Sequence, residues 1–422
     1  MNTMQNENTE LGTDKGKLRI AVTSEITSYP VEDASVSISY SGVPEERPLE
    51  QLKTDRSGMT EEIELDTPPL EYSLDPKIQA QPYAEYTLRI QAPGYETMSI
   101  AGTELLPQVT AIQNVRLRPV NPEGEDDVFV IPGHTLYEEY PSKIAEDEIK
   151  PTNETGEIVL SRVVIPEYIV VHDGSPRDTT AKNYYVRYKD YIKNVASSEI
   201  YATWPENTIR ANVLAIMSFT LNRVYTEWYR NKGFDFTITS STAFDHKWIP
   251  ERNIFEPISV IVDELFADYL SRPNVRQPIL TQYCDGRRVS CPNWLTQWGS
   301  KSLGEQGFSP IEILRYYYGD DMYINTAEAI SGVPSSWPGY TLEQGSQGPK
   351  VRQIQEELNV IAGAYPEIPK VTEDGIYGPE TEAAVRKFQS IFGLPVTGDV
   401  DYKTWYKISE IYVGVSRIAE LS

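Results

Sequence analysis

Two cysteines, Cys284 and Cys291, are the only cysteines in the 422-residue chain, and six residues separate them. Thiolates are good zinc ligands, but a Cys-x6-Cys spacing is wider than the usual zinc knuckle, so the spacing alone indicates little. A disulfide that closes the intervening loop is the second explanation, and it fits an exported protein. Two free thiols in a reducing compartment are the third. We favour the disulfide over the other two.

The charge of the chain excludes one class of partner. Lysine and arginine number 38 against 62 aspartate and glutamate residues, a formal net charge of −24. Nucleic-acid binding needs clustered basic side chains at the phosphates, so we expect no nucleic-acid partner. No apolar run approaches the ~20 residues that span a membrane, so we expect no membrane span. The N-terminal residues lack the apolar stretch of a signal peptide.

Short strands dominate residues 18–118, because apolar and polar residues alternate between turn-rich stretches. This pattern predicts an N-terminal all-β sandwich. The alternating segments are LRIAVTS, ASVSISYSG, MTEEIELD, AEYTLRIQAPG and TAIQNVRLRP. The phrase YTLRIQAPGYETMSIAGTEL resembles the carboxypeptidase regulatory-like fold, which implies a spacer or adhesion module. Residues 1–17 are polar and predicted to be disordered, and residues 119–165, rich in Pro, Glu and Asp, predict an acidic connector.

Residues 166–332 mix strand and helix patterns, which predicts a central α+β domain. IPEYIVVHDG predicts a strand, whereas YVRYKDYIKNVASSEI and ENTIRANVLAIMSFTLNRVYTEWYRNKG carry the apolar spacing of helices. FEPISVIVDELFADYLSRP predicts a helix that ends before Pro273. LTQWGSKSLGEQGFSPIEILRYYYG predicts two short helices, and Ser309 with Pro310 caps the second.

Two stretches of this domain, Tyr191–Arg223 and Leu295–Ile324, resemble the stage II sporulation protein D family, also called the amidase-enhancer domain. The shared pattern is a glutamate before a hydrophobic residue and a Trp-Pro pair, a helix, and a later Thr-Gln-Trp-Gly segment with a YYYG end. The resemblance implies a lytic transglycosylase that cleaves peptidoglycan glycan strands. It assigns the catalytic role to Glu199, and it makes Trp204, Asn212 and Gln297 substrate-binding residues.

One carboxyl group suffices for that reaction. The acid that protonates the leaving oxygen can then deprotonate the muramyl 6-hydroxyl group, which closes a 1,6-anhydro ring. Hydrolytic glycosidases, in contrast, need two carboxyl groups. The nearby Tyr201 and Trp204 predict an apolar environment that favours the protonated acid. The alternative for Glu199 is a solvated glutamate at a helix end.

Departures from the family pattern leave a second function open. Asn212 and Met217 stand where the family usually carries Gln and Arg, and Cys291–Leu295 replaces a Gly-His-Gly stretch. Methionine cannot replace a guanidinium. The alternative is therefore a catalytically inactive protein that binds wall or assists an amidase. Some family members also bind zinc through one histidine and two cysteines, and the resemblance offers His246, Cys284 and Cys291 as that set.

Residues 341–413 predict a C-terminal module of three helices, with residues 333–340 as a linker and 414–422 as a tail. Two apolar stripes carry the prediction. They are formed by Val351, Ile354, Leu358 and Ile361, and by Ala384, Val385, Phe388 and Ile391. The motifs QGSQGPKVRQIQEEL, DGIYGPETEAAVRKFQ and GLPVTGDVD resemble the type 1 peptidoglycan-binding domain, which implies noncovalent binding to bacterial cell wall.

Three residues of one loop are the candidate ligand contacts of this module: Asp374, Tyr377 and Gly378. A sugar–peptide ligand needs an aromatic face and a few fixed hydrogen-bonding groups. The alternative is that these residues only build the helical core. The resemblances together imply peptidoglycan glycan strands as the partner, with other wall or spore proteins as further partners. They place the protein in the cell wall or the spore, made in a mother cell or carried on a phage tail.

Overall fold

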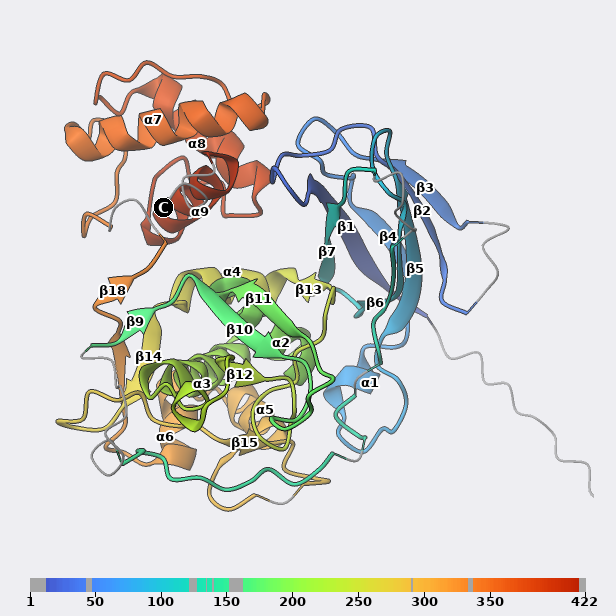
Figure 1. Cartoon of the computed structure of the whole chain (residues 1–422), viewed down its shortest axis with the longest axis vertical. Helices are drawn as coiled ribbons and strands as arrows, with labels where there is room; N and C mark the ends of the chain where they lie inside the picture. Colours follow the sequence, from blue (N-terminus) through green and yellow to red (C-terminus); the bar gives the residue numbers. More distant parts are fainter. Residues whose placement is uncertain are drawn as a thin grey trace, which may run out of the picture.

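The computed structural model describes residues 13–42, 48–120, 127–133, 135–138, 140–151, 162–289, 291–332 and 337–416. Figure 1 shows three parts: an N-terminal pair of sheets, a central region of helices and short strands, and a C-terminal group of helices. The N-terminal sheets and the C-terminal helices both lie against the central region. Among the described residues, no helix is both long enough and apolar enough to cross a membrane.

The N-terminal part consists mainly of strands that alternate buried and exposed side chains. In β1, Leu18, Ile20 and Val22 are fully buried. The strands of this part are β1 (Asp14–Ser24), β2 (Ser35–Tyr40), β3 (Glu50–Lys53), β4 (Ile63–Thr67), β5 (Ala84–Gln91), β6 (Met98–Leu105), β7 (Thr110–Leu117) and β8 (Asp127–Val130). One sheet has the order β3-β2-β5-β6-β8, and the other has the order β13-β7-β1-β4.

Two features of this part differ from the predicted all-β sandwich. A short helix, α1 (Glu71–Leu74), follows β4, and strand β13 (Ile254–Phe255) of the central region completes the second sheet beside β7. The predicted disorder of residues 1–17 is wrong at its end, because β1 begins at Asp14 and pairs with β4. Residues 1–12 lie outside the described residues. The sheets are thus fixed to the central region by shared strand pairing.

The central part surrounds one long buried helix, α3 (Glu206–Tyr225). A helix that is apolar on nearly all sides must be covered on all sides, and α3 contacts α2, α4, α5, α6 and β14. The helices are α2 (Tyr188–Glu199), α3, α4 (Glu256–Leu265), α5 (Gln297–Glu305) and α6 (Pro310–Tyr318). The strands, besides β13, are β9 (Val164–Ile165), β10 (Tyr168–His172), β11 (Asn183–Arg187), β12 (Ile238–Thr239), β14 (Asp268–Ser271), β15 (Tyr283–Cys284), β16 (Leu295–Thr296), β17 (Tyr323–Thr326) and β18 (Ala329–Ile330).

The local signals at helix ends have mixed outcomes. Ser309 caps α6 with a full capping box, in which the Glu312 carboxylate accepts from the Ser309 N–H at 2.8 Å. Helix α4 ends at Leu265, earlier than predicted, because residues 268–271 pair with β17 as strand β14. Pairing with a distant strand overrides the local helix pattern there.

The predicted acidic connector is not a free linker where the structure describes it. Gln282 Nε2 donates to the Ile144 carbonyl at 2.7 Å, and the side-chain oxygen Oε1 of Gln282 accepts from the Glu146 N–H at 2.9 Å. Gln277 makes the same two-way contact with the backbone of Lys150. Polar side chains of the central part therefore hold residues 140–150 along its surface.

The C-terminal part contains α7 (Pro349–Ala364), α8 (Pro379–Ile391) and α9 (Tyr402–Ser416). Helix α9 runs into the predicted tail, and residues 417–422 lie outside the described residues. In the predicted linker, the Trp337 ring packs on that of Trp405, with ring centroids 6.0 Å apart. The backbone N–H of Trp337 donates to the Tyr406 hydroxyl. The linker's residues 333–336 are not described.

Candidate functional site

Glu199 is the last residue of α2, because Ile200 adopts an extended conformation and ends the helix. The side chain is not the solvated helix end of the alternative interpretation, since the residue is only 7% exposed. One carboxylate oxygen accepts from the Lys247 N–H at 2.8 Å, and the other accepts from Gln297 Nε2 at 3.1 Å. Gln297 Nε2 also donates to the Glu199 carbonyl at 2.8 Å. The structure thus brings together two of the predicted site residues.

Glu199 and Gln297 line a pocket of about 40 Å³. The predicted connector supplies part of its wall through Leu136, Tyr140 and Lys143. A cavity of this size holds water but no sugar ring, since ligand pockets in proteins measure ~300–1,000 Å³. The described part of segment 135–143 therefore covers the Glu199 carboxyl group in this conformation.

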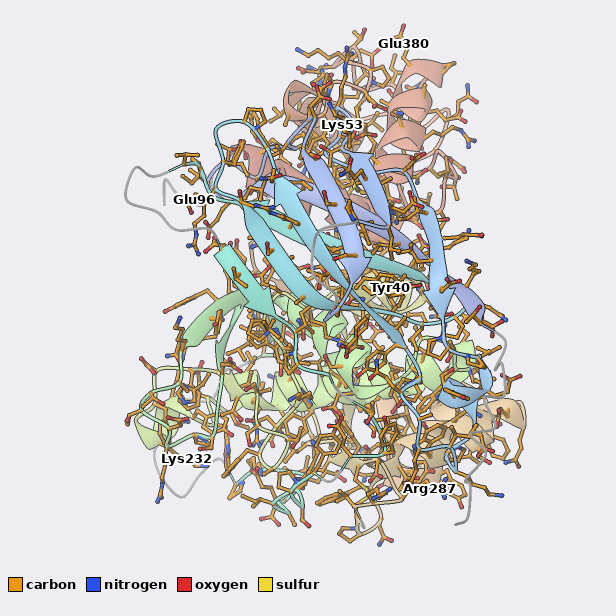
Figure 2. All side chains as sticks on the ribbon, turned by 90° about the vertical axis from the view of Figure 1, so that its right-hand side faces the viewer. Tyr40, Lys53, Glu96, Lys232, Arg287 and Glu380 are labelled. Atoms are coloured by element: carbon orange, nitrogen blue, oxygen red, sulfur yellow. A yellow bond between two sulfur atoms is a disulfide. The ribbon has the colours of Figure 1, made fainter. Side chains whose placement is uncertain are left out.

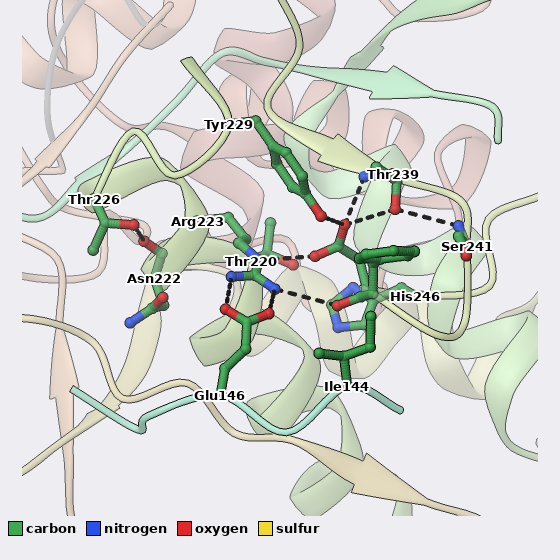
Figure 3. Close-up of polar contacts among 12 residues, drawn as sticks. Ile144, Glu146, Thr220, Asn222, Arg223, Thr226, Tyr229, Thr239, Ser241 and His246 are labelled. Atoms are coloured by element: carbon green, nitrogen blue, oxygen red, sulfur yellow. Dashed lines mark hydrogen bonds and ion pairs between the residues drawn. The ribbon is translucent and has the colours of Figure 1, made fainter. Parts of the chain in front are cut away.

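Arg223 of α3 forms buried ion pairs with two segments near the Glu199 pocket, the one that contains Glu146 and the one that contains Asp245 (Figure 3). Arg223 donates to both carboxylate oxygens of Glu146, at 2.6 and 3.0 Å, and to Asp245 at 2.8 Å. The Tyr229 hydroxyl donates to the same Asp245 carboxylate at 2.6 Å. Glu146 fixes the covering segment, whereas Asp245 fixes the loop whose Lys247 N–H binds Glu199. Arg223 is therefore a positioning residue for the pocket.

Two ionisable groups, those of Lys143 and Tyr283, lie in the pocket beside Glu199. Lys143 donates to the Asp245 carbonyl at 2.6 Å. Burial lowers the pKa of its ammonium group, and the negative charges of Glu199 and Asp245 oppose this effect. Burial raises the pKa of the Tyr283 hydroxyl well above its usual value, and the charge of Glu199 adds to the increase. The pocket therefore places an amine and a phenol near one carboxylate.

A second carboxyl group, that of Asp285, lines the same pocket. Its two oxygens accept from the Arg288 and Val289 N–H groups, at 2.7 and 2.9 Å. These bonds stabilise the turn that follows β15. The Asp285 carboxylate is thus occupied by hydrogen bonds within its own loop. Glu199, which residues of other segments hold in place, is the carboxyl group that the pocket offers for proton transfer to a ligand oxygen.

Trp204 and Asn212 do not line this pocket, so their predicted substrate role stays a prediction. The Trp204 indole N–H donates to the Ser73 carbonyl of α1 at 2.9 Å, and the residue is 3% exposed. Asn212 donates to the Thr208 carbonyl and to the Ser300 hydroxyl, which joins α3 to α5. Both side chains use their polar groups to hold elements together. Met217, the other departure from the family pattern, is fully buried.

The structure confirms the favoured disulfide over the alternative zinc set of His246, Cys284 and Cys291. Cys284 and Cys291 form a disulfide, so neither sulfur is a thiolate that could bind zinc. His246 is fully buried; its Nδ1 lies 3.0 Å from the Tyr191 hydroxyl. Burial lowers the pKa of this imidazole well below its usual value. The described residues contain no group of three or more His, Cys, Asp or Glu side chains able to hold a metal ion.

The C-terminal loop residues have structural contacts of their own. Tyr377 is 1% exposed, and its hydroxyl donates to the Gly398 carbonyl at 2.7 Å, so it presents no aromatic face to a ligand. The exposed Asp374 accepts from the Ile376 N–H and from Gln355, which orders the loop. Gly378 precedes α8 as its N-cap residue. The predicted ligand role of Tyr377 is therefore corrected, and those of Asp374 and Gly378 stay predictions.

Comparison with known proteins gives a family match for the C-terminal part of the chain. Residues 347–408 match the family described as "Putative peptidoglycan binding domain", so this part of the chain is a peptidoglycan-binding domain. The match covers α7, α8 and the first half of α9, the elements that the sequence predicted for this module.

Individual relatives and solved structures each match a part of this chain. The zinc D-Ala-D-Ala carboxypeptidase of Streptomyces albus G is 39% identical over 76 residues, 18% of this chain and 28% of the relative. The autolytic lysozyme of Clostridium acetobutylicum is 29% identical over 145 residues, 31% of this chain and 42% of the relative. The solved N-terminal domain of SleB shares 28% identity over 18% of this chain and 99% of that domain, with a TM-score of 0.16. The chain thus spans less than half the length of either curated relative.

Sequence reasoning missed Lys143, Tyr283 and Asp285 as pocket residues. Lys143 lies in a segment whose acidic composition is typical of a linker. Tyr283 and Asp285 flank Cys284, and the cysteine was the only signal that drew attention to that segment. No local pattern marks these three residues, because only the folded chain places them beside Glu199.

Proposed function

We propose that this protein binds bacterial peptidoglycan through its C-terminal domain and cleaves glycan strands as a lytic transglycosylase through Glu199. The observation that carries the catalytic half is the contact of Gln297 with Glu199 inside a pocket that also contains Lys143 and Tyr283. The family match of residues 347–408 supports the binding half. The cell wall, and in a spore former the cortex, is the place where such a protein acts.

In the proposed reaction, the protonated Glu199 carboxyl group gives its proton to the glycosidic oxygen while the bond from that oxygen to C1 breaks. The resulting carboxylate then takes the proton of the muramyl 6-hydroxyl group, whose oxygen bonds to C1 and closes the anhydro ring. No water is consumed, so the reaction needs no second carboxylate to activate one. Gln297 and the Lys247 N–H orient the carboxyl group. Segment 135–143 must move to admit the strand.

A second function, wall binding without cleavage, is favoured by the size of the pocket. The cavity of about 40 Å³ admits no sugar, and residues of segment 135–143 form its cover. If this cover stays closed on peptidoglycan, the central domain acts only as part of a wall-bound scaffold.

Purified sacculi incubated with the protein separate the two functions, with soluble products identified by mass spectrometry. We expect anhydro-muramyl products and a loss of at least ~100-fold in their release for Glu199→Gln. Glu206→Gln is the matched control, since this glutamate is 67% exposed on α3. Equal release by Glu199→Gln would overturn the catalytic role. Protein that pellets with sacculi but yields no product would establish the second function.

A further inference from the structure

A cavity of about 420 Å³ lies where the three parts of the chain meet. Strands β1 and β7 supply one wall, β11 with the start of α2 the second, and α9 with the end of α8 the third. In Figure 1 this junction lies between the C-terminal helices, the sheets and β11. We refer to it as the junction groove. It lies apart from the Glu199 pocket and shares no lining residue with it.

Basic residues outnumber acidic ones in the lining of the junction groove, although the chain as a whole is strongly acidic, and each of these basic residues except Arg187 is paired with a carboxylate. Its charged lining residues are Arg19, Glu25, Arg116, Arg187, Asp190, Lys193, Lys407 and Glu410. Five of these eight are basic, in a chain where acidic residues outnumber basic ones by 62 to 38. All three parts contribute a positive charge. Only the assembled molecule therefore presents this site.

Arg187 is the residue that points most clearly to a ligand. It lies at the end of β11 and precedes α2, and it lines the groove while only partly exposed. Among the described residues it forms no ion pair and no hydrogen bond through its side chain. The acids whose charges act on it are Glu410, Asp190 and Glu167. Glu410 already pairs with Lys189 at 2.5 Å and Asp190 with Arg116 at 3.7 Å, whereas Glu167 forms no ion pair within the described part of the chain, with Arg187 or with any other base. A half-buried guanidinium without a carboxylate partner favours an anionic ligand.

Aromatic side chains stand beside this guanidinium group. Tyr168 is 41% exposed and its ring centroid lies 5.8 Å from the Arg187 guanidinium carbon. Tyr185, two residues before Arg187 on β11, is 74% exposed. Exposed tyrosines on a rigid strand supply flat, amphipathic contact area for sugars and peptides. The groove therefore combines an anion-binding group with surfaces for the rest of a ligand.

We infer that the junction groove binds the carboxylate-bearing peptide stem of peptidoglycan, with Arg187 holding a stem carboxylate. This inference rests on the proposed function, because it names a second contact with the same polymer. The groove lining also carries three carboxylates, those of Glu25, Asp190 and Glu410. A ligand with single carboxylates on a peptide therefore fits this lining better than a polyanion of repeated phosphates does. The groove and the C-terminal domain then bind one peptidoglycan polymer at two places, which raises the overall affinity of the protein for the polymer.

Isothermal titration of the full chain with a soluble lysine-containing stem pentapeptide tests the inference. We expect binding to weaken at least 10-fold for Arg187→Ala, the loss typical of a charge-assisted hydrogen bond. Arg287→Ala is the matched control, because Figure 2 places this exposed arginine at the end of the molecule opposite Glu380. Should Arg187→Ala fail to fold, Tyr185→Ala decides, since so exposed a side chain contributes little to folding. It should weaken binding several-fold.

Two outcomes would overturn the inference. They are pentapeptide affinity equal in all variants, and no pentapeptide binding by the unmodified chain, whether or not it binds polyglycerol phosphate. Pelleting with sacculi distinguishes these results from failure of the proposed function. If the unmodified chain pellets but ignores the pentapeptide, only the groove assignment fails. If it does not pellet, the proposed function fails.

Discussion

Glu357 is a buried acid of α7 that makes the stability of the peptidoglycan-binding domain depend on pH. The residue is 4% exposed, and one carboxylate oxygen accepts from Gln353 at 2.8 Å. Burial raises the pKa of this carboxyl group to about 7 from 4.5, although Gln353 and Lys350 oppose the increase. The folded state thus binds a proton more tightly than the unfolded state. Stability is greatest below pH ~4.5 and falls as the pH rises to about 7.

We predict that Glu357→Gln stabilises this domain by about 3 kcal/mol at pH 8 and has little effect at pH 4.5. Calorimetric unfolding of the full chain at pH 4.5 and pH 8 measures the difference. Glu356→Gln is the control, because this neighbour on the same helix is exposed. An identical pH dependence in the original and Glu357→Gln chains would contradict the prediction.

Two helices of the same domain hold their following loops by one repeated arrangement. Gln355 on α7 accepts from the Gly375 N–H at 2.8 Å and donates to the Thr381 hydroxyl at 3.1 Å. Gln389 on α8 accepts from the Gly398 N–H at 2.9 Å and donates to the Thr404 hydroxyl at 3.2 Å. Both glutamines are 1% exposed. The repeated geometry explains why each loop carries a glycine and why a threonine follows six residues later, in the first turn of the next helix.

We predict that Gln355→Leu and Gln389→Leu each destabilise the domain by about 2–4 kcal/mol, because each leaves a buried glycine N–H without its acceptor. Thermal unfolding of the full chain measures the loss. Glu356→Leu and Ser390→Leu change the exposed neighbour of each glutamine and serve as controls. Similar melting temperatures for a glutamine variant and its control would show that the arrangement contributes nothing.

The three parts of the molecule are joined by buried ion pairs rather than by apolar packing alone. Glu104 of β6 and Arg252 pair at 2.7 Å, each with a side chain 2% exposed. On the other side, Asp263 of α4 accepts from Lys189 and Lys193 of α2, and Lys189 also contacts Glu410 of α9 at 2.5 Å. These contacts fix the junction groove between the parts. A change at this joint should therefore affect the groove as well.

We predict that Glu410→Gln loosens the C-terminal domain from the central part by about 2–3 kcal/mol, since Lys189 loses one of its two carboxylate partners. Faster hydrogen exchange in both α4 and α9 would report the loosening. Glu382→Gln is the control, because Glu382 pairs with Arg386 inside the C-terminal domain. Unchanged exchange in α4 would show that this ion pair does not hold the joint.

Much of the local structure could be predicted because its signals lie close together in the sequence. The capping box at Ser309 and the apolar stripes of α7 and α8 involve residues within a few positions of one another. The predicted continuation of α4 up to Pro273 is wrong, because these residues form β14, which pairs with β17 some 50 residues later in the chain. An aromatic residue was the weakest guide. Tyr377 was predicted to contact the ligand, but its hydroxyl and ring serve the core.

The sequence by itself determined the C-terminal domain, the strand-rich N-terminal part and the helices of the central part, because periodicity, caps and motifs are local properties. Tertiary structure alone decided which groups surround Glu199. Lys143, Lys247 and Gln297 reach it from positions about 50 to 100 residues away, held there by Arg223 and by the helix packing around α3. Only the tertiary structure revealed the junction groove, since its basic residues belong to all three parts. Distances in space between such residues depend on the packing of whole elements, which no local pattern encodes.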